Sequence, residues 1–290
     1  MVEDEVHEMV TRAVREAVDA EERGVLVRLD QGAIGWICQV SDWWPSEQAN
    51  AAQTMIRSLR DPTAIPLLVA LVTGARQMPP DCAQSLPYWC VEAATAIPGE
   101  RTLAALLEVL TESSGNTTDL RAAVAEALGD RGDMHAIDGL RTTLTEIGSG
   151  QSDGEHRWLK VKTATALAKL GDAGGLAVAV DALGDEWAPV RWGAVQAIEV
   201  LRPPNAVELL SPLIHDPDAR HDAIRSLAEV GTPEAIDVLI PLADDPDRDV
   251  AELCVMTVVK LIGLRVDHNA GQLPDRAGLA AAWQQIRQTE

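Results

Sequence analysis

The chain has 290 residues, of which 47% are hydrophobic, 24% charged and only 3% aromatic, and its formal net charge is −21. This composition is typical of a soluble globular protein and excludes an intrinsically disordered one. Because nucleic-acid binding draws most of its affinity from Lys and Arg, so acidic a chain is expected to bind no nucleic acid and to favour cationic partners. No apolar run reaches the ~18 residues that a membrane span needs, so no membrane contact is expected.

The first 46 residues follow no repeating pattern and are predicted to form an N-terminal cap. Residues 3–22 have the apolar spacing of an amphipathic helix, and their acidic start, MVEDEVHEMV, does not resemble a secretion signal. Residues 24–46, GVLVRLDQGAIGWICQVSDWWPS, have no helical period, and whether they form a small-ligand site is left open. The four cysteines form no CxxC motif, so we expect a reduced, cytoplasmic protein. Arg outnumbers Lys 20 to 4, which favours a bacterial origin.

From residue 47 to residue 264 the sequence repeats itself. The segments LRAAVAEALGDRGD (120–133), LKVKTATALAKLGD (159–172) and VRWGAVQAIEVLRP (190–203) share one template: an apolar residue, a basic residue, then small or apolar residues at +4, +7, +8 and +11. That spacing is the period of a helix with one buried face. The starts at 48, 89, 120, 159, 190, 219 and 251 are 29 to 41 residues apart, and each is followed by a second helical stretch such as EAIDVLIPLA (234–243). No segment shows the sustained alternation of a strand.

The repeat predicts an all-α protein, a right-handed α-solenoid of about six helix pairs with terminal caps. Residues 265–290 supply the C-terminal cap, where RAGLAAAWQQIRQ is expected to place Leu279 and Trp283 inward. Asp/Pro turns such as HDPDAR and ADDPDRDV separate the repeats. The basic template position is expected to pair with turn aspartates such as Asp185 and Asp216; it holds Arg121, Lys160, Arg191 and Arg220.

Three stretches carry a resemblance to a known family: DEWAPVRWGAVQAI, DPDARHDAIRSLAEVGTPEAIDVLIPL and DLRAAVAEALGDRGDMHAIDGL. They resemble HEAT repeats, in particular the short bacterial kind similar to the phycobilisome-lyase HEAT-like family. The resemblance covers roughly residues 47–264 and implies a helical solenoid. Such solenoids host binding scaffolds and a few enzymes alike, so the resemblance indicates the fold far more than the function.

Tryptophans recur close to the starts of the repeats. These candidate binding residues are Trp43, Trp44, Trp89, Trp158, Trp187 and Trp192. Trp is enriched in binding hot spots because one side chain supplies a large apolar area with a polar handle. The alternative is that each indole wedges between neighbouring repeats.

Two prolines occupy the same position of adjacent second helices. Pro212 and Pro241 are 29 residues apart, and a proline inside a helix clashes with the carbonyl four residues back. Those carbonyls belong to Glu208 and Asp237. The prolines predict either a tolerated kink or a bend that exposes these carbonyls and carboxylates to a cationic ligand.

Other candidate chemistry is sparse. His215 and His221, with the aspartates of HDPDARH between them, suit either a metal site or an ordinary capped turn, and the turn is favoured. Cys82 and Cys90 suggest either a reactive thiol site or plain core residues, and the core is favoured. We therefore predict no metal site, no cofactor and no catalytic residue set.

The expected function is a non-enzymatic scaffold whose curved surface binds a protein or peptide partner with a basic segment. The alternative implied by the resemblance is a lyase-like enzyme that acts on a tetrapyrrole or a similar planar substrate. A third is a DNA glycosylase of the HEAT-like type, which the negative charge disfavours. The sequence leaves the oligomeric state and the identity of the partner open.

Overall fold

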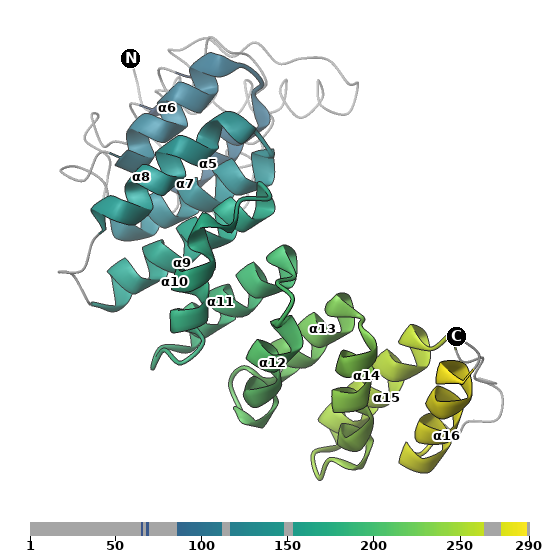
Figure 1. The fold of residues 1–290 in the computed structure, drawn as a ribbon. Coiled ribbons are helices and arrows are strands. Elements are labelled where there is room, and N and C mark those ends of the chain that lie inside the picture. Colours follow the sequence, from purple (N-terminus) through teal and green to yellow (C-terminus); the bar gives the residue numbers. More distant parts are fainter. Residues whose placement is uncertain are drawn as a thin grey trace, which may run out of the picture. The chain divides into compact units, whose positions relative to one another are not determined.

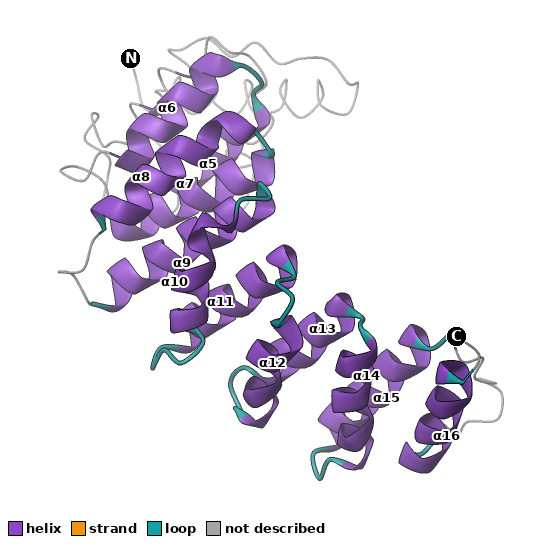
Figure 2. Ribbon diagram, in the orientation of Figure 1, coloured by secondary structure: helices purple, strands orange, loops and turns teal. Residues whose placement is uncertain are grey.

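The structure is a computed structural model that describes residues 65, 68–69, 86–111, 117–147, 153–263 and 274–288. Within these ranges the chain forms helices and connecting turns and no strand (Figure 1, Figure 2), so the predicted all-α solenoid class is confirmed. Trp43, Trp44, Cys82 and both predicted N-terminal segments lie outside the described residues. No helix in the described ranges is long and apolar enough to cross a bilayer. The chain divides into two compact units, Met1–Asp172 and Ala173–Glu290, which are treated separately.

The first unit is built from two layers of helices. One layer consists of the first helices of the repeats, which lie side by side: α5 (Leu86–Ala96), α7 (Thr118–Arg131) and α9 (Gly154–Lys169). The other layer holds the second helices, α6 (Glu100–Thr111) and α8 (Ile137–Glu146), with the 3-10 turn η3 (Met134–Ala136) leading into α8. A single buried cluster of mostly Leu, Val, Ile and Ala fills the space between the layers, as the 3.6-residue spacing predicts.

The second unit follows the same plan. Its first helices are α11 (Ala188–Leu201), α13 (Arg220–Val230) and α15 (Arg248–Leu261), which contact one another in that order. Its second helices are short and partly 3-10: η4 (Ala173–Gly175) with α10 (Leu176–Ala182), α12 (Ala206–Leu210) with η5 (Ser211–His215), and α14 (Pro233–Leu239) with η6 (Ile240–Asp244). The last helix is α16 (Arg276–Arg287).

The predicted proline bends appear as changes of helix type. The α-helix α12 ends at Leu210 and α14 ends at Leu239, and in both cases a 3-10 segment begins with the proline as its second residue. Pro has no N–H to donate and its ring crowds the carbonyl four residues back, so the tighter i→i+3 pattern replaces the α pattern at that point. In the first of these bends the Ser211 hydroxyl donates to the carbonyl of Val207 at 2.5 Å.

Five of the described first helices, all except α5, are followed within two residues by a residue with left-handed backbone. At four of these ends the residue is glycine, with φ of 64° to 75°: Gly132, Gly171, Gly231 and Gly263. At the end of α11 the corresponding residue is Arg202, with φ 46°. Glycine adopts this conformation without a Cβ clash. Arg202 is therefore a locally strained replacement at an otherwise regular cap.

Two first helices approach each other very closely in the first unit. A Cβ built on Gly129 of α7 would lie 2.8 Å from Cα of Ala166 on α9 and 3.1 Å from its Cβ. No side chain larger than hydrogen fits at Gly129 unless the backbone of α9 moves. The absence of a side chain at Gly129 thus allows the short distance between α7 and α9.

Helix α16 covers the end of the second unit. Leu279 and Trp283 are buried, as the sequence predicted, and α16 packs on η6 and α15. The Trp283 indole Nε1–H donates to Oδ1 of Asp237 at 2.7 Å, and Arg287 forms an ion pair with Oδ2 of the same carboxylate at 3.0 Å. One aspartate on α14 thus holds the terminal helix through two side chains.

We expect Gly129→Ala to lower the free energy of unfolding by about 1–2 kcal/mol, because the overpacking penalty exceeds the gain in helix propensity. Gly184→Ala is the matched control, since a Cβ there meets nothing within 4 Å. Urea unfolding of both variants measures the difference. Equal stability of the two would show that α7 and α9 are not held in close contact at Gly129.

We expect Arg202→Gly to raise the free energy of unfolding by about 0.5–1 kcal/mol, because it relieves a left-handed non-glycine residue. The reverse change at the equivalent position, Gly231→Arg, should lower it, since Gly231 has φ +64°. Thermal melts followed by circular dichroism give the sign of each change. A loss of stability in Arg202→Gly would contradict the strain.

Candidate functional site

Arg191, between Trp187 and Trp192, faces inward and has a structural role. Its side chain is 10% exposed. One guanidinium nitrogen donates to the carbonyls of Asp185 at 2.8 Å and Glu186 at 3.2 Å, in the turn before α11. The rest of the group reaches the next turn, with Nε 2.9 Å from Oδ2 of Asp216 and the second terminal nitrogen 3.1 Å from Oδ2 of Asp218. Arg191 therefore joins two successive inter-repeat turns.

The residues at the other basic template positions do not all bind the aspartates of an inter-repeat turn. Arg220 forms an ion pair with Asp247, in the next inter-repeat turn along the chain. Arg121 departs from the expectation: its Nε donates to the carbonyl of Leu110 at 2.7 Å, at the end of α6. Burial lowers the pKa of Arg121, an effect that the charge of Glu146 opposes. The pairing with turn aspartates is thus right for Arg191 and Arg220, whereas Arg121 binds a helix-end carbonyl that would otherwise lack a partner.

The HDPDARH stretch is accounted for as a turn. Oδ1 of Asp216 accepts the backbone N–H of Asp218 at 2.9 Å, and both carboxylates bind Arg191. His215 and His221 are exposed. Within the part of the chain that the structure describes, no three His, Cys, Asp or Glu side chains gather in a way that could hold a metal ion.

The two described cysteines are core residues. Cys90 and Cys254 are both fully buried. Burial and, to a lesser extent, the charge of Asp245 raise the pKa of Cys254 to about 12, so the thiolate is strongly disfavoured at neutral pH.

The described tryptophans divide into two kinds. Trp89 and Trp158 are partly buried and pack against the core of the first unit, and the Trp158 ring lies 4.7 Å from Nζ of Lys162. Trp187 and Trp192, at the start of α11, are 39% and 38% exposed. The first pair contacts the core as wedged indoles do, and the second pair presents apolar surface to solvent. Whether any of them binds a partner stays a prediction.

The carboxylates predicted beside the proline bends also differ. Asp237 binds Trp283 and Arg287 of α16, so it is engaged within the chain. Glu208 is exposed on α12. The bends therefore do not gather the two carboxylates for the same task.

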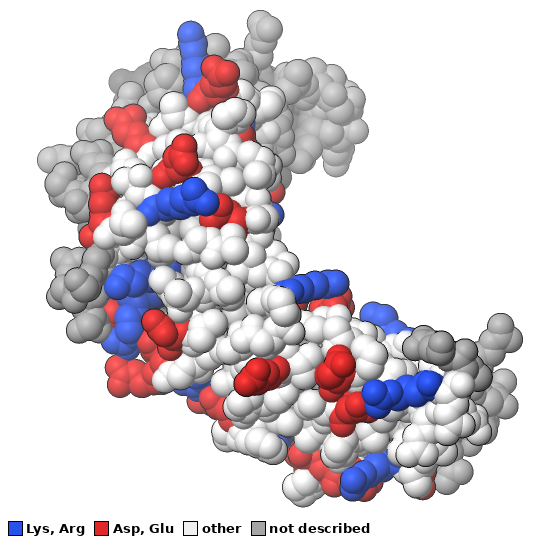
Figure 3. All heavy atoms as spheres, in the orientation of Figure 1, with Lys and Arg blue, Asp and Glu red and all other residues white. Residues whose placement is uncertain are grey.

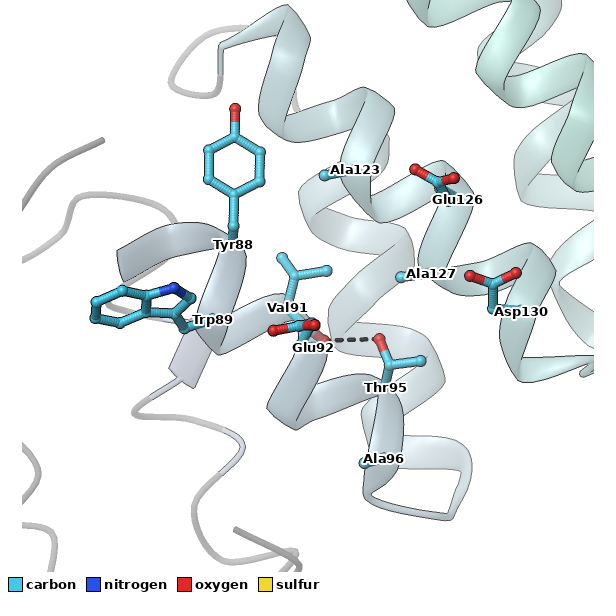
Figure 4. A pocket seen from close by; sticks show the side chains of 10 residues that line it. All are labelled: Tyr88, Trp89, Val91, Glu92, Thr95, Ala96, Ala123, Glu126, Ala127 and Asp130. Carbon is cyan, nitrogen blue, oxygen red and sulfur yellow. Dashed lines mark hydrogen bonds between the residues drawn. The ribbon is translucent and has the colours of Figure 1, made fainter. Parts of the chain in front are cut away.

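A groove in the first unit brings together one predicted tryptophan and several residues that the sequence did not single out (Figure 4). It lies between α5 and α7, has a volume of about 660 Å³, and is called the α5–α7 groove below. Its lining is Tyr88, Trp89, Val91, Glu92, Thr95, Ala96, Ala123, Glu126, Ala127 and Asp130.

The shape of the α5–α7 groove follows from small residues on facing helices. Ala96 of α5 and Ala123 and Ala127 of α7 leave room between the two first helices. Tyr88 and Trp89 stand at one end of the groove, at the start of α5, and Asp130 lies toward the other (Figure 4). Tyr88 is 38% exposed. Burial and, to a lesser extent, the charge of Asp119 raise the pKa of its phenol, so the hydroxyl stays protonated at neutral pH.

Lysines from α9 hold two carboxylates of the α5–α7 groove. Nζ of Lys162 lies 2.9 Å from Oε1 of Glu126, and Nζ of Lys169 lies 2.5 Å from Oδ1 of Asp130. Each lysine uses one oxygen of its partner. The Lys162 side chain is buried and lies over the Trp158 ring. Trp158 thus supports the groove through Lys162 instead of lining it.

A second groove, of about 520 Å³, crosses α11, α13 and α15 in the second unit. Trp192 lines it, together with carboxylates and cations: Glu199, Asp222, Glu229, Arg225 and Lys260. Several of these are paired within the groove, since Ser226 donates to Glu199 at 2.5 Å and Arg225 contacts Asp222. Because acidic and basic side chains both line this groove, it discriminates less between cationic and anionic partners than the α5–α7 groove does.

The layered helix pairs define an α-solenoid repeat protein. Residues 176–259 match the family model of HEAT repeats. This match falls within residues 47–264, where the repeat template indicated HEAT repeats. No curated protein sequence matches it.

Solved structures with a similar arrangement of helices share little sequence with the chain. An engineered protein is 19% identical, with 89% of this chain and 74% of that chain covered and a TM-score of 0.43. The complex of CpcE and CpcF of phycocyanin lyase from Nostoc sp. PCC7120 is 14% identical, with 90% and 96% covered and a TM-score of 0.49. Human deoxyhypusine hydroxylase in complex with glycerol is 18% identical, with 88% and 96% covered and a TM-score of 0.34. At these identities and TM-scores, no conclusion about this chain rests on the likeness.

We expect Arg191→Ala to lower the free energy of unfolding by about 2–3 kcal/mol, because it leaves two carbonyls and two carboxylates without their shared cation. Arg225→Ala is the control, since Arg225 is exposed and its ion pair with Asp222 joins residues of one helix; such pairs contribute about 0.3–0.5 kcal/mol. Urea unfolding compares the two. A loss no larger in Arg191→Ala than in Arg225→Ala would contradict the role of Arg191 between the turns.

Proposed function

We propose that the protein is a non-enzymatic interaction scaffold that binds a basic segment of a protein partner in the α5–α7 groove. The observation that supports this most directly is the lining of the groove, where two aromatic rings and three carboxylates, Glu92, Glu126 and Asp130, surround a floor of alanines. Rings and carboxylates together match a segment that carries both apolar and cationic side chains.

The charge of the whole chain supports the same class of partner. A net charge of −21 draws cationic segments toward the protein over long distances. On the face drawn in Figure 3, basic and acidic side chains lie next to one another, and the described residues on that face form no continuous basic band. A duplex would need such a band, so a protein partner is favoured over nucleic acid. The lyase-like and DNA glycosylase alternatives stay predictions from the sequence.

The test uses the full chain and two octapeptides, one with eight basic residues and one with eight glutamates. We expect binding of the basic peptide alone, measured by isothermal titration calorimetry, and a dissociation constant that rises about tenfold or more between 50 and 500 mM salt because exposed charges are screened. Binding that does not change with salt would contradict an electrostatic contribution.

A matched pair of variants locates the site. The double variant Glu126→Gln, Asp130→Asn removes two charges from the α5–α7 groove, and the control Glu108→Gln, Asp138→Asn removes two charges from exposed positions on the second helices of the same unit. The groove variant should weaken binding of the basic peptide and the control should not. An equal loss in both would show that net charge, and not the groove, binds the peptide.

A further inference from the structure

We infer that the α5–α7 groove recognises an arginine, together with an apolar side chain about three residues away in an extended peptide segment. This inference rests on the proposed function, because it names the chemistry of the segment that the same groove binds. It depends on three features of the described residues: an ordered pair of carboxylates, their neutralisation by lysines, and the distance from them to the aromatic end.

The carboxylates of Glu126 and Asp130 are ordered before any ligand arrives. They are four residues apart on α7, so they lie on one face of the helix with Cβ atoms about 5–6 Å from each other. Lys162 holds Glu126 through Oε1 and Lys169 holds Asp130 through Oδ1. The other oxygens, Oε2 and Oδ2, take no part in these ion pairs. A ligand therefore meets two carboxylates that already have ion-pair partners, Glu126 with a buried lysine and Asp130 with a more exposed one.

The lysines also decide which cation the pair prefers. Because Lys162 and Lys169 offset part of the charge of Glu126 and Asp130, an incoming cation gains less from net charge here than it would at two unpaired carboxylates. Directional hydrogen bonds therefore contribute a larger share of its binding. A guanidinium carries five N–H donors in a planar fork and is weakly hydrated, so it can donate to two carboxylates at once, whereas an ammonium is a strongly hydrated point charge. The geometry thus favours arginine over lysine.

The length of the groove sets the spacing of the ligand residues. From Ala123 to Asp130 the groove follows eight residues of α7, a rise of about 10 Å along the helix axis. A peptide extended in the polyproline II conformation covers about 9 Å in three residues, and its three residues per turn return the side chain at the third position to the same face. An arginine at the carboxylates therefore places the side chain three positions away at Tyr88 and Trp89, whose rings offer apolar surface.

The experiment compares four labelled peptides in one Gly/Ser host, with binding to the full chain measured by fluorescence anisotropy in 150 mM salt. The first has Leu and Arg three positions apart, the second replaces Arg by Lys, the third places Leu and Arg side by side, and the fourth replaces Leu by Ser. We expect the first to bind about tenfold more tightly than the second, because its hydrogen bonds are bidentate, and about tenfold more tightly than the fourth, because Leu is buried. The third should also bind more weakly than the first.

Three variants separate the contributions. Asp130→Asn, whose ion pair with Lys169 is largely exposed and so affects stability little, should weaken the arginine peptide and bring the ratio of arginine to lysine affinity close to one. Glu126→Gln should do the same, and thermal melts report any loss of fold from its partner, the buried Lys162. Lys169→Gln should strengthen the lysine peptide more than the arginine peptide, because it restores the net charge of Asp130. Glu108→Gln is the control and should leave all four affinities unchanged.

The outcomes distinguish the inference from the function on which it rests. If the arginine and lysine peptides bind equally and both are lost in the groove variants, the basic-segment scaffold stands and the arginine inference is overturned. If arginine binding persists in both Asp130→Asn and Glu126→Gln, the inference is likewise wrong. If no basic peptide binds, the proposed function itself fails at this groove.

Discussion

The close approach of neighbouring first helices is the constraint on which the rest of the first unit depends. Gly129 of α7 faces Ala166 of α9 with no room for a methyl group, and at that distance the lysines of α9 reach the carboxylates of α7. A wider spacing would leave Glu126 and Asp130 as solvated side chains, each free to adopt several rotamers. The ion pairs of the candidate site thus depend on the close backbone packing of α7 and α9 within one layer.

In the second unit, turn chemistry has a comparable role. A buried arginine at the start of one first helix gathers the carbonyls of its own turn and the aspartates of the next. Its five donors suit this task because the acceptors diverge from two turns. Side-chain packing fixes the distance between repeats, and these charge-assisted hydrogen bonds fix how the turns meet.

The fold could be predicted from the sequence because the same pattern recurs in every repeat. Apolar positions at helical spacing, glycine at the helix ends and aspartate in the turns agree with one another, so an irregularity such as Arg202 does not hide the pattern. The proline positions likewise predicted bends, which the structure shows as a change from α to 3-10 geometry.

The α5–α7 groove was much harder to predict. It depends on how α5 sits beside α7 and on lysines that come from a third helix, and the offset between neighbouring helices is not contained in the period of any one of them. The sequence analysis proposed tryptophans as binding residues. In the α5–α7 groove, however, alanines create the space and carboxylates line much of it. Asp237 shows the same limit, because its partners Trp283 and Arg287 lie 46 and 50 residues away in sequence.

The contacts between Asp237 and α16 also affect where further repeats could be added to such a protein. Repeat arrays lengthen by duplication of a unit, and a new unit needs an uncovered helix layer on which to stack. At the end of the second unit that layer is occupied by α16, through the Trp283 and Arg287 contacts with one carboxylate. A copy placed after α15 would therefore compete with a helix that is already bonded there. Asp237 thus helps to hold the helix that covers the last repeat.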